Sequence, residues 1–151
     1  METKKEIKIR PIKDGTAIDH LPVGTALKVV EILKIPKEAT TVAMNVPSKK
    51  HGKKDIVFIE NRKLKEEEID KIALIARNAT INLIHGSGIA KKERATIPEE
   101  VTDIIKCINP NCITNREAVQ SKFIIKERPL SAKCFYCETI MDEKEIANGI
   151  K

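Results

Sequence analysis

The chain has 151 residues, of which 28 are Lys or Arg and 22 are Asp or Glu, so its formal net charge at pH 7 is +6. This length suits one ordinary core, or a domain of about 100 residues joined to a metal-stapled module of about 50. No stretch approaches the roughly 18 consecutive apolar residues of a membrane-spanning helix, so we expect no membrane partner. The start METKKEIKIR is charged and lacks the apolar centre of a signal peptide, which predicts a reducing, cytoplasmic setting.

The positive charge favours anionic partners, which include nucleotides, nucleic acid and acidic protein surfaces. The sign of the charge does not choose among them. The chain has no Trp, one Tyr and three Phe, which is little material for stacking the bases of a single strand.

Residues 6–13 alternate between two faces and predict a β-strand, which Pro11 places at a sheet edge because proline has no N–H to donate. The Asp-Gly pair at 14–15 predicts a turn. From Pro22, apolar residues recur at three- and four-residue spacings up to Pro36. This pattern predicts an amphipathic helix that packs on a sheet.

Two strand-like runs, at 41–46 and 56–60, are joined by the basic segment PSKKHGKKD and predict a hairpin. We expect the lysines of that loop to be solvated. A second amphipathic helix is expected from Leu64, with three glutamates at 66–68 in its first turn and Arg77 at its end. These charges suit the helix dipole at both ends.

Residues 80–85 and 89–94 predict two further strands, separated by a Gly-Ser-Gly turn. The order of elements is then β-α-β-β-α-β with one addition, which predicts an α+β protein with a ferredoxin-like α/β sandwich. That fold hosts many functions and predicts none by itself. Pro98 is the expected connector, so we place the N-terminal domain at 1–98.

The remaining segment, 99–151, holds all four cysteines of the chain. Cys107 and Cys112 enclose four residues, Cys134 and Cys137 enclose two, and twenty-one residues separate the pairs. Two close thiol pairs brought together by a hairpin are typical of a structural Zn²⁺ site. Four protein ligands leave no open position for water or substrate, so this metal would hold structure and would not catalyse.

Disulfide bonds are the alternative for these cysteines, because four of them allow three pairings. The expected reducing setting favours zinc. We therefore expect residues 99–151 to form a small all-β zinc domain with four cysteine ligands, and strands at 123–126 and 131–134.

The sequence shows no set of residues that would make the chain an enzyme. Of its three histidines, His51 lies in the lysine-rich loop and His85 ends a strand, where we expect a hydrogen-bonding role. Asp19 and His20 precede a predicted helix, where Asp19 can accept from hydroxyls and the helix start can attract an anion. Asp19 suits a local turn or cap equally well. Lys92 can meet a phosphate or simply face solvent.

Six segments spread along the chain form one ordered pattern: GTAIDHLP (15–22), MNVPS (44–48), GKKDIVFIEN (52–61), ATINLI (79–84), CINPNC (107–112) and KCFYCE (133–138). In this order and spacing, the pattern resembles the regulatory chain of aspartate carbamoyltransferase. The resemblance implies a non-catalytic subunit in pyrimidine biosynthesis. It further implies an N-terminal allosteric domain for CTP and ATP, a C-terminal zinc domain that docks on the catalytic chain, and regulatory dimers that link catalytic trimers.

The resemblance also implies which residues contact the nucleotide: Arg10, Pro11, Ile12, Asp19, His20, Asn82, Ile84, Ile89 and Lys92. This chain has Phe58 where the best-known members of the family carry a second lysine, in the third strand, that contacts the nucleotide. Loss of such a charge-assisted hydrogen bond removes about 1.5 to 3 kcal/mol. Arg10, at a position where the family often has an acid, is a candidate to compensate.

In the zinc domain, the resemblance assigns contacts with the catalytic chain to Asn109, Asn111, Arg128 and Glu138. Metal-held turns would fix such short side chains and lower the entropy cost of docking. The two asparagines also suit the turns themselves, and both roles can coexist.

A basic zinc-ribbon protein that binds nucleic acid is the alternative function. The scarcity of aromatic residues opposes it, and so do the carboxylates that follow the second thiol pair, at Glu138, Asp142, Glu143 and Glu145, because they would repel phosphate.

Overall fold

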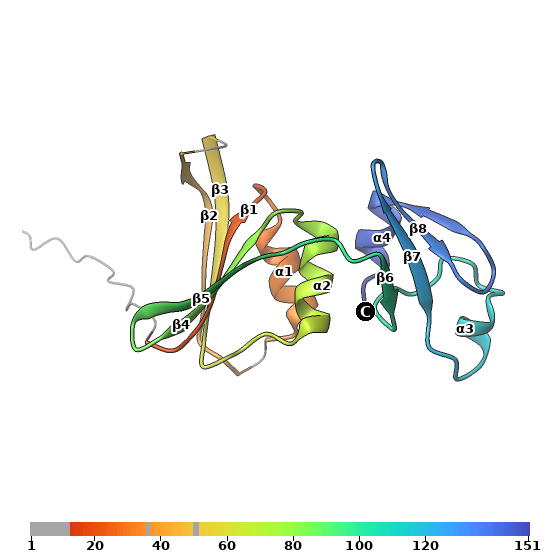
Figure 1. Ribbon diagram of the computed structural model, residues 1–151, viewed down its shortest axis with the longest axis horizontal. Helices are drawn as coiled ribbons and strands as arrows, with labels where there is room; N and C mark the ends of the chain where they lie inside the picture. The colour runs from red at the N-terminus through yellow and green to blue at the C-terminus, as the bar shows by residue number, and fades with distance from the viewer. Residues whose placement is uncertain (1–12, 36, 50–51) are drawn as a thin grey trace, which may run out of the picture.

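The computed structural model describes residues 13–35, 37–49 and 52–151. Figure 1 shows two units side by side, each built on its own β-sheet. The first unit consists of β1 (Gly15–Leu21), α1 (Ala26–Leu33), β2 (Thr40–Ser48), β3 (Gly52–Glu60), α2 (Glu66–Ile75), β4 (Thr80–His85) and β5 (Gly88–Arg94). The second consists of β6 (Glu100–Thr102), α3 (Ile113–Arg116), β7 (Lys122–Glu127), β8 (Leu130–Cys134), β9 (Ile140–Asp142) and α4 (Glu143–Gly149).

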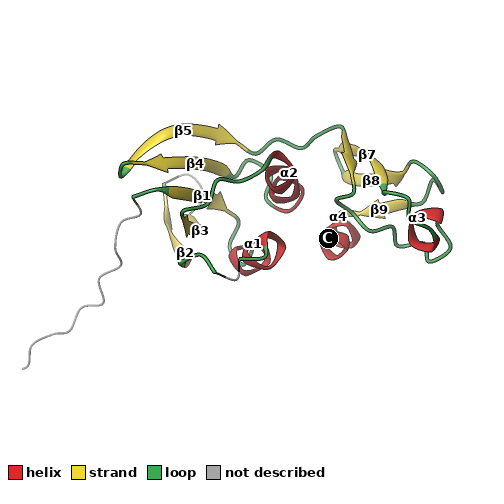
Figure 2. Ribbon diagram, turned by 90° about the horizontal axis from the view of Figure 1, so that it is seen from below, coloured by secondary structure: helices red, strands yellow, loops and turns green. Residues whose placement is uncertain are grey.

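The first sheet has the strand order β2-β3-β1-β4-β5, and every neighbouring pair is antiparallel. Figure 2 shows α1 and α2 together on one face of this sheet. The arrangement is the predicted ferredoxin-like sandwich, with β5 as the added edge strand. The predicted fold class is therefore confirmed, including the small β domain that follows. On the other face of the sheet, no helix of the described residues covers the strands.

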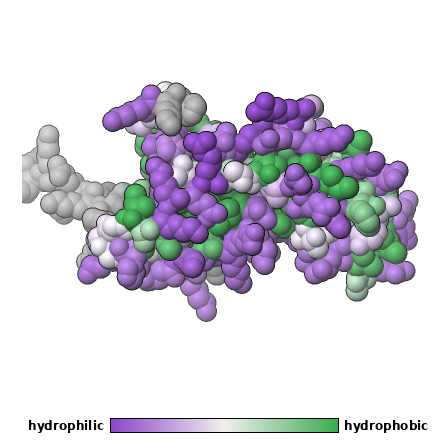
Figure 3. Space-filling model, viewed as in Figure 1, coloured by the Kyte–Doolittle hydropathy of each residue, from purple (hydrophilic) through white to green (hydrophobic). Residues whose placement is uncertain are grey.

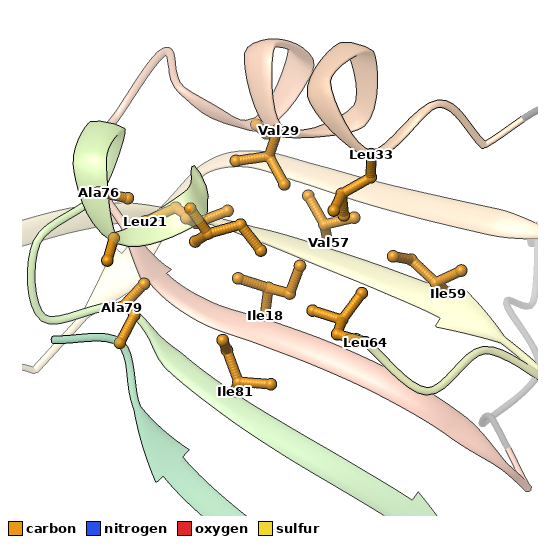
Figure 4. Close-up of a cluster of buried hydrophobic side chains, with 14 residues drawn as sticks. Ile18, Leu21, Val29, Leu33, Val57, Ile59, Leu64, Ala76, Ala79 and Ile81 are labelled. Atoms are coloured by element: carbon orange, nitrogen blue, oxygen red, sulfur yellow. The ribbon is translucent and has the colours of Figure 1, made fainter. Parts of the chain in front are cut away.

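The first core lies between the sheet and these two helices. Ile18 of β1 and Val57 and Ile59 of β3 are fully buried there, against Val29 of α1 and Ile72 of α2. Figure 4 shows the strand residues and Val29 pointing toward one another across the core. Burial of each such side chain stabilises the fold by roughly 1.5 to 3 kcal/mol.

The prediction was wrong about β1, which occupies residues expected to form a turn and the approach to a helix. β1 lies between β3 and β4 at the centre of the sheet. Its first residue, Gly15, has a φ of 148°, and a Cβ there would lie 2.1 Å from the Ile59 carbonyl oxygen. Only glycine fits this close approach. The strand predicted at 6–13 lies outside the described residues, except for Lys13.

The β2–β3 hairpin was predicted, but its strands extend further than expected and take up most of the supposed loop. A bulge lies between Ala43 and Val46, where Asn45 has a φ of 59°. The predicted helices are also present with shorter bounds, and α1 begins at Ala26 rather than at Pro22.

Asp55 explains both the bulge and the start of α1. This carboxylate is fully buried, and its Oδ2 accepts hydrogen bonds from the backbone N–H of Gly24 (2.9 Å) and of Ala26 (3.2 Å). Its Oδ1 accepts from the N–H of Asn45 at 2.8 Å. A negative charge at the first turn of α1 also favours the helix dipole. One side chain of β3 thus fixes both the helix start and the hairpin.

The second sheet has the order β6-β7-β8-β9, and Phe123, Ala132, Met141 and Ile146 are fully buried in its core. Strands β7 and β8 were predicted, whereas the strands β6 and β9 and the helices α3 and α4 were not. Figure 3 shows that hydrophilic residues cover much of this face of the molecule, and that hydrophobic residues also reach the surface over the second unit.

Two of the carboxylates near the thiols have a structural role at the start of α4. Asp142 Oδ1 accepts from the Glu145 N–H at 2.8 Å, and Glu145 Oε1 accepts from the Asp142 N–H at 3.0 Å. This capping box begins the helix.

The two units meet at α2. Its residue Leu74 is buried in the second core rather than the first, and α2 contacts α4. Ile97 of the connecting segment packs against both cores. Within the described ranges, no helix is long and apolar enough to cross a membrane.

Substitution of Asp55 tests how far one buried carboxylate stabilises the first unit. We expect Asp55→Ala to lower the free energy of unfolding by about 3 kcal/mol, because the backbone N–H groups of Gly24, Ala26 and Asn45 all lose this fully buried acceptor. Asp55→Asn, which keeps one acceptor oxygen, should lose less. Calorimetric unfolding of the two variants measures the difference. A loss below about 0.5 kcal/mol in Asp55→Ala would contradict this role.

Candidate functional site

The four cysteines come together from two loops of the second unit. One thiol of each sequence pair lies against one of the other pair: Cys107 Sγ is 3.6 Å from Cys137 Sγ, and Cys112 Sγ is 3.7 Å from Cys134 Sγ. All four sulfur atoms lie within 4.8 Å of one another. Sulfurs held tetrahedrally at about 2.3 Å from one ion would be separated by about 3.8 Å. The thiol geometry therefore fits a single tetrahedral metal ion, whereas disulfide bonds need about 2.05 Å.

Polar side chains hold the loops that carry the thiols. The hydroxyl oxygens of Thr114 and Thr139 each lie 3.2 Å from a thiol, that of Cys112 and that of Cys137. The Asn115 amide donates to the backbone carbonyls of Cys107 (2.9 Å) and Asn109 (2.7 Å). Such outer contacts orient the ligands of a metal site.

Burial and hydrogen bonding together give these thiols different pKa values. It raises the pKa of Cys107 to about 12 and raises that of Cys134 as well. Burial also acts to raise the pKa of Cys137, but hydrogen bonds from Thr139 and Asn109 outweigh it and lower the pKa to about 6. Since the metal ligand is the thiolate, a bound cation must displace protons from the buried thiols.

A second candidate site is a cavity of about 680 Å³ in the first unit. It lies where β1, β3, β4 and β5 end beside the end of α2. Five cations line it, together with a histidine, two apolar residues and two small polar ones: Lys53, Lys54, Arg77, Lys92, Arg94, His20, Leu21, Pro22, Asn78 and Thr80. No carboxylate is among the described residues of this lining.

Of the residues predicted for the nucleotide, His20 and Lys92 line this cavity. The other four cations were missed, because a lysine in a basic loop or an arginine after a helix looks solvated in sequence. The strand order reveals them, since it brings Lys53, Lys54 and Arg94 to the same end of the sheet as His20.

Asp19 and His20 precede a helix, as predicted, but they lie in the strand β1, several residues before α1 begins at Ala26. The Asp19 carboxylate is paired with Lys54 Nζ at 2.9 Å, and it accepts a hydrogen bond from the backbone N–H of His20. Burial acts to raise the pKa of Asp19, but these contacts lower it below its usual value on balance. The His20 ring lies against the Thr80 hydroxyl, with Nδ1 3.1 Å from Oγ1.

Asn82 and Lys92 are direct partners across β4 and β5, and Ala17 and Phe58 continue the same row across β1 and β3. Asn82 is buried, and its Oδ1 has no hydrogen-bond partner among the described residues. A buried acceptor without a partner is rare and marks a position that a ligand can complete.

The remaining nucleotide candidates lie further along or outside the described residues. Ile84 and Ile89 are partners on β4 and β5, two positions beyond Asn82. Ile89 is exposed. Residues 10–12, which include Arg10, Pro11 and Ile12, lie outside the part of the chain that the structure describes.

Three of the four residues assigned to the catalytic-chain interface lie at the thiol loops. Asn109 Oδ1 accepts from the Asn111 N–H at 3.0 Å, and Glu138 has a φ of 63° just after the last thiol. Arg128 lies apart from them, in the turn between β7 and β8, at the end of that hairpin furthest from Cys134.

Comparison with known proteins gives the same assignment over nearly the whole chain. A family model described as "Aspartate carbamoyltransferase regulatory chain, allosteric domain" matches residues 7–96, and one described as "Aspartate carbamoyltransferase regulatory chain, metal binding domain" matches residues 99–147. The chain is 51% identical over 146 residues to the aspartate carbamoyltransferase regulatory chain of Pyrococcus abyssi, covering 93% of this chain and 96% of that one. It is 48% identical over 148 residues to that of Thermococcus sibiricus, covering 97% and 99%. It is 48% identical over 141 residues to that of Methanocaldococcus jannaschii, covering 92% and 95%.

Removal of the metal tests whether the thiol cluster holds the second unit together. We expect a strong chelator to unfold β6 to β9 and leave the first sheet folded, because four clustered thiols without a cation lose their common partner. Hydrogen exchange, measured before and after chelation, follows both sheets separately. Cys134→Ser should reproduce the effect. A second sheet that stays protected without metal would contradict it.

Proposed function

This chain belongs to the family of aspartate carbamoyltransferase regulatory chains, and we propose that its first domain binds CTP and ATP while its second domain links catalytic trimers. The family makes the chain a non-catalytic subunit with an allosteric and a metal-binding domain, whose partner is the catalytic chain. We place these domains at 1–98 and 99–151. The observation that supports the nucleotide most is the cation-lined cavity, because one of its lining residues, Lys92, is the cross-strand partner of Asn82, whose Oδ1 has no hydrogen-bond partner among the described residues.

Charge and size both suit a nucleotide triphosphate in that cavity. Five cations and no carboxylate among the described lining residues create a positive field for an anion. A volume of about 680 Å³ is within the range of small-ligand pockets. We therefore favour a nucleotide over the nucleic-acid alternative.

Different polar side chains of the first domain contact the phosphates, the base and the ribose of the proposed ligand. Lys92 and His20 face the phosphates, and Asn82 offers its free oxygen to an amino group of the base. Asp19, which is paired with Lys54, accepts hydrogen bonds from the ribose hydroxyls once Lys54 turns toward the phosphates. Lys54 then exchanges one charged partner, the Asp19 carboxylate, for another, the phosphate. The remaining contacts of this proposal are Ile84, Ile89 and residues 10–12.

Phe58 gives this chain an apolar ring in the row that contains Asn82 and Lys92, at the position where the resemblance gives the best-known members of the family a lysine. We propose that Lys54 and Arg94 supply part of the missing charge, since both line the cavity.

We propose Zn²⁺ as the metal, because four thiolates in tetrahedral reach of one ion are its usual structural ligands. The ion fixes the loops that present Asn109, Asn111 and Glu138 to the catalytic chain. The neighbouring Phe135 and Tyr136 are about half exposed and stack edge to face, so they add apolar area to the same surface.

We also propose the regulatory dimer that the family resemblance implies. Val23 and Leu27, at the start of α1, are 53% and 61% exposed and offer apolar contacts for it.

Calorimetric titration of CTP and ATP tests the nucleotide site. We expect Lys92→Ala to weaken both affinities about tenfold or more, because it removes a cation that meets phosphate. Lys126→Ala, which removes a cation from the second sheet, is the matched control and should bind normally. Equal affinities in the two variants would contradict the site, and no heat of binding in the unaltered chain would contradict the proposed effectors.

Assembly with the cognate catalytic trimer tests the docking surface. We expect Asn111→Ala to fold with its metal but to weaken assembly about tenfold, since an exposed contact of the metal loops is lost. Gln120→Ala removes another exposed amide of the same domain and should assemble normally. Sedimentation at several chain concentrations gives both affinities. Unchanged assembly of Asn111→Ala would place the contact elsewhere.

A further inference from the structure

The C-terminal end of α2 and the residue that caps it pack into both cores. Ala76 is fully buried in the first core, whereas Leu74, two residues earlier, is buried in the second. Figure 1 shows α2 on the side of the first domain that faces the second, with α4 and the β7–β8 hairpin opposite. A movement of the end of this helix therefore alters the packing of both cores.

Arg77 follows this turn and makes contacts in both directions. Its Nη2 donates a hydrogen bond to the Glu127 carbonyl oxygen of the β7–β8 hairpin at 3.1 Å. Arg77 also lines the cavity, together with Lys53, Lys92 and Arg94. We propose that Arg77 is the residue through which an anion bound in the cavity acts on the second domain. This inference rests on the proposed nucleotide site.

The Arg77 guanidinium has two possible acceptors, the Glu127 carbonyl and a phosphate in the cavity, and the hydrogen bonds that they accept differ in strength. Phosphate is charged and accepts hydrogen bonds about twice as strong as those of a neutral carbonyl. The side chain of Arg77 is exposed, so it can turn without breaking a packed core. A triphosphate in the cavity therefore draws Arg77 toward itself and weakens its bond to Glu127.

The hairpin carries this change toward the metal site. Glu127 pairs with Leu130, which is buried in the second core, and the same ladder ends at Phe123 and Cys134. Arg128, in the turn of this hairpin, is one of the residues proposed to meet the catalytic chain. Loss of the Arg77 bond thus loosens an element that joins the docking surface to the metal ligands.

Coupling of this kind is reciprocal. If the anion weakens the Arg77 bond to the hairpin, then a partner that holds the hairpin in its bonded position must weaken anion binding by the same factor. Docking of the catalytic chain and occupation of the cavity are linked through this one side chain.

Hydrogen exchange of the full, metal-loaded chain tests the inference, with ATP as the probe. In the unaltered chain, saturating ATP should speed exchange of the hairpin amides at 126–131 by about fivefold or more, the lower end of typical couplings. In Arg77→Ala, these amides should already exchange at the faster rate, and ATP should not change them. Arg77→Gln, which keeps an amide donor without the charge, should respond weakly.

Lys53→Ala is the matched control, because it removes a cavity cation on β3 and leaves the Arg77 bond in place. It should need more ATP but show the full hairpin response at saturation. Calorimetry on the same samples establishes saturation. If ATP binds the unaltered chain and the hairpin does not respond, or if Arg77→Ala responds fully, this inference is overturned while the proposed function stands. If ATP does not bind at all, both fall together.

Discussion

The structure of the second domain depends on four thiols that lie within 4.8 Å of one another. Deprotonated and withdrawn from water, they would repel each other strongly, so they need a cation in their midst. A core as small as that around Phe123 and Met141 gives a domain of this size limited stability, and a metal supplies the remainder. The turns at Asn109 and Glu138 then have fixed positions because the thiols beside them are fixed.

The first domain depends on a different constraint, the central position of β1. Only at the centre can β1 pair with both β3 and β4 and so align Phe58, Asn82 and Lys92 in one row. Asp55 then sets the helix start and the hairpin from the other face of β3. The cavity is thus a product of strand order, and its cations come from segments that are distant in sequence.

This difference explains which features could be read from the sequence. The thiol cluster was predicted because two pairs of cysteines at short sequence spacings are by themselves typical of a metal site. The strand β1 was missed because Asp-Gly is a usual turn, and only the approach of Gly15 to Ile59 requires the glycine in a strand. Lys54 was missed for a similar reason, since its partner Asp19 is 35 positions away. Local patterns predicted the elements, and contacts across the sheet decided their roles.

The junction between the domains is suited to regulation because its contacts are few and of different kinds. Leu74 and Ile97 contribute apolar burial, which holds the domains together whether or not a ligand is present. Arg77 contributes a single exposed hydrogen bond, worth about 0.5 to 1.5 kcal/mol when the acceptor is neutral. A charged ligand gains about 1.5 to 3 kcal/mol from the same donor, so it can outweigh the carbonyl but not the packing. The nucleotide proposed for the cavity would therefore alter how the domains are coupled without separating them. A shift of this size changes the balance between two arrangements about tenfold, which falls short of the roughly 5.5 kcal/mol that a complete switch requires. One such junction can therefore adjust the balance between two arrangements but cannot complete a switch by itself.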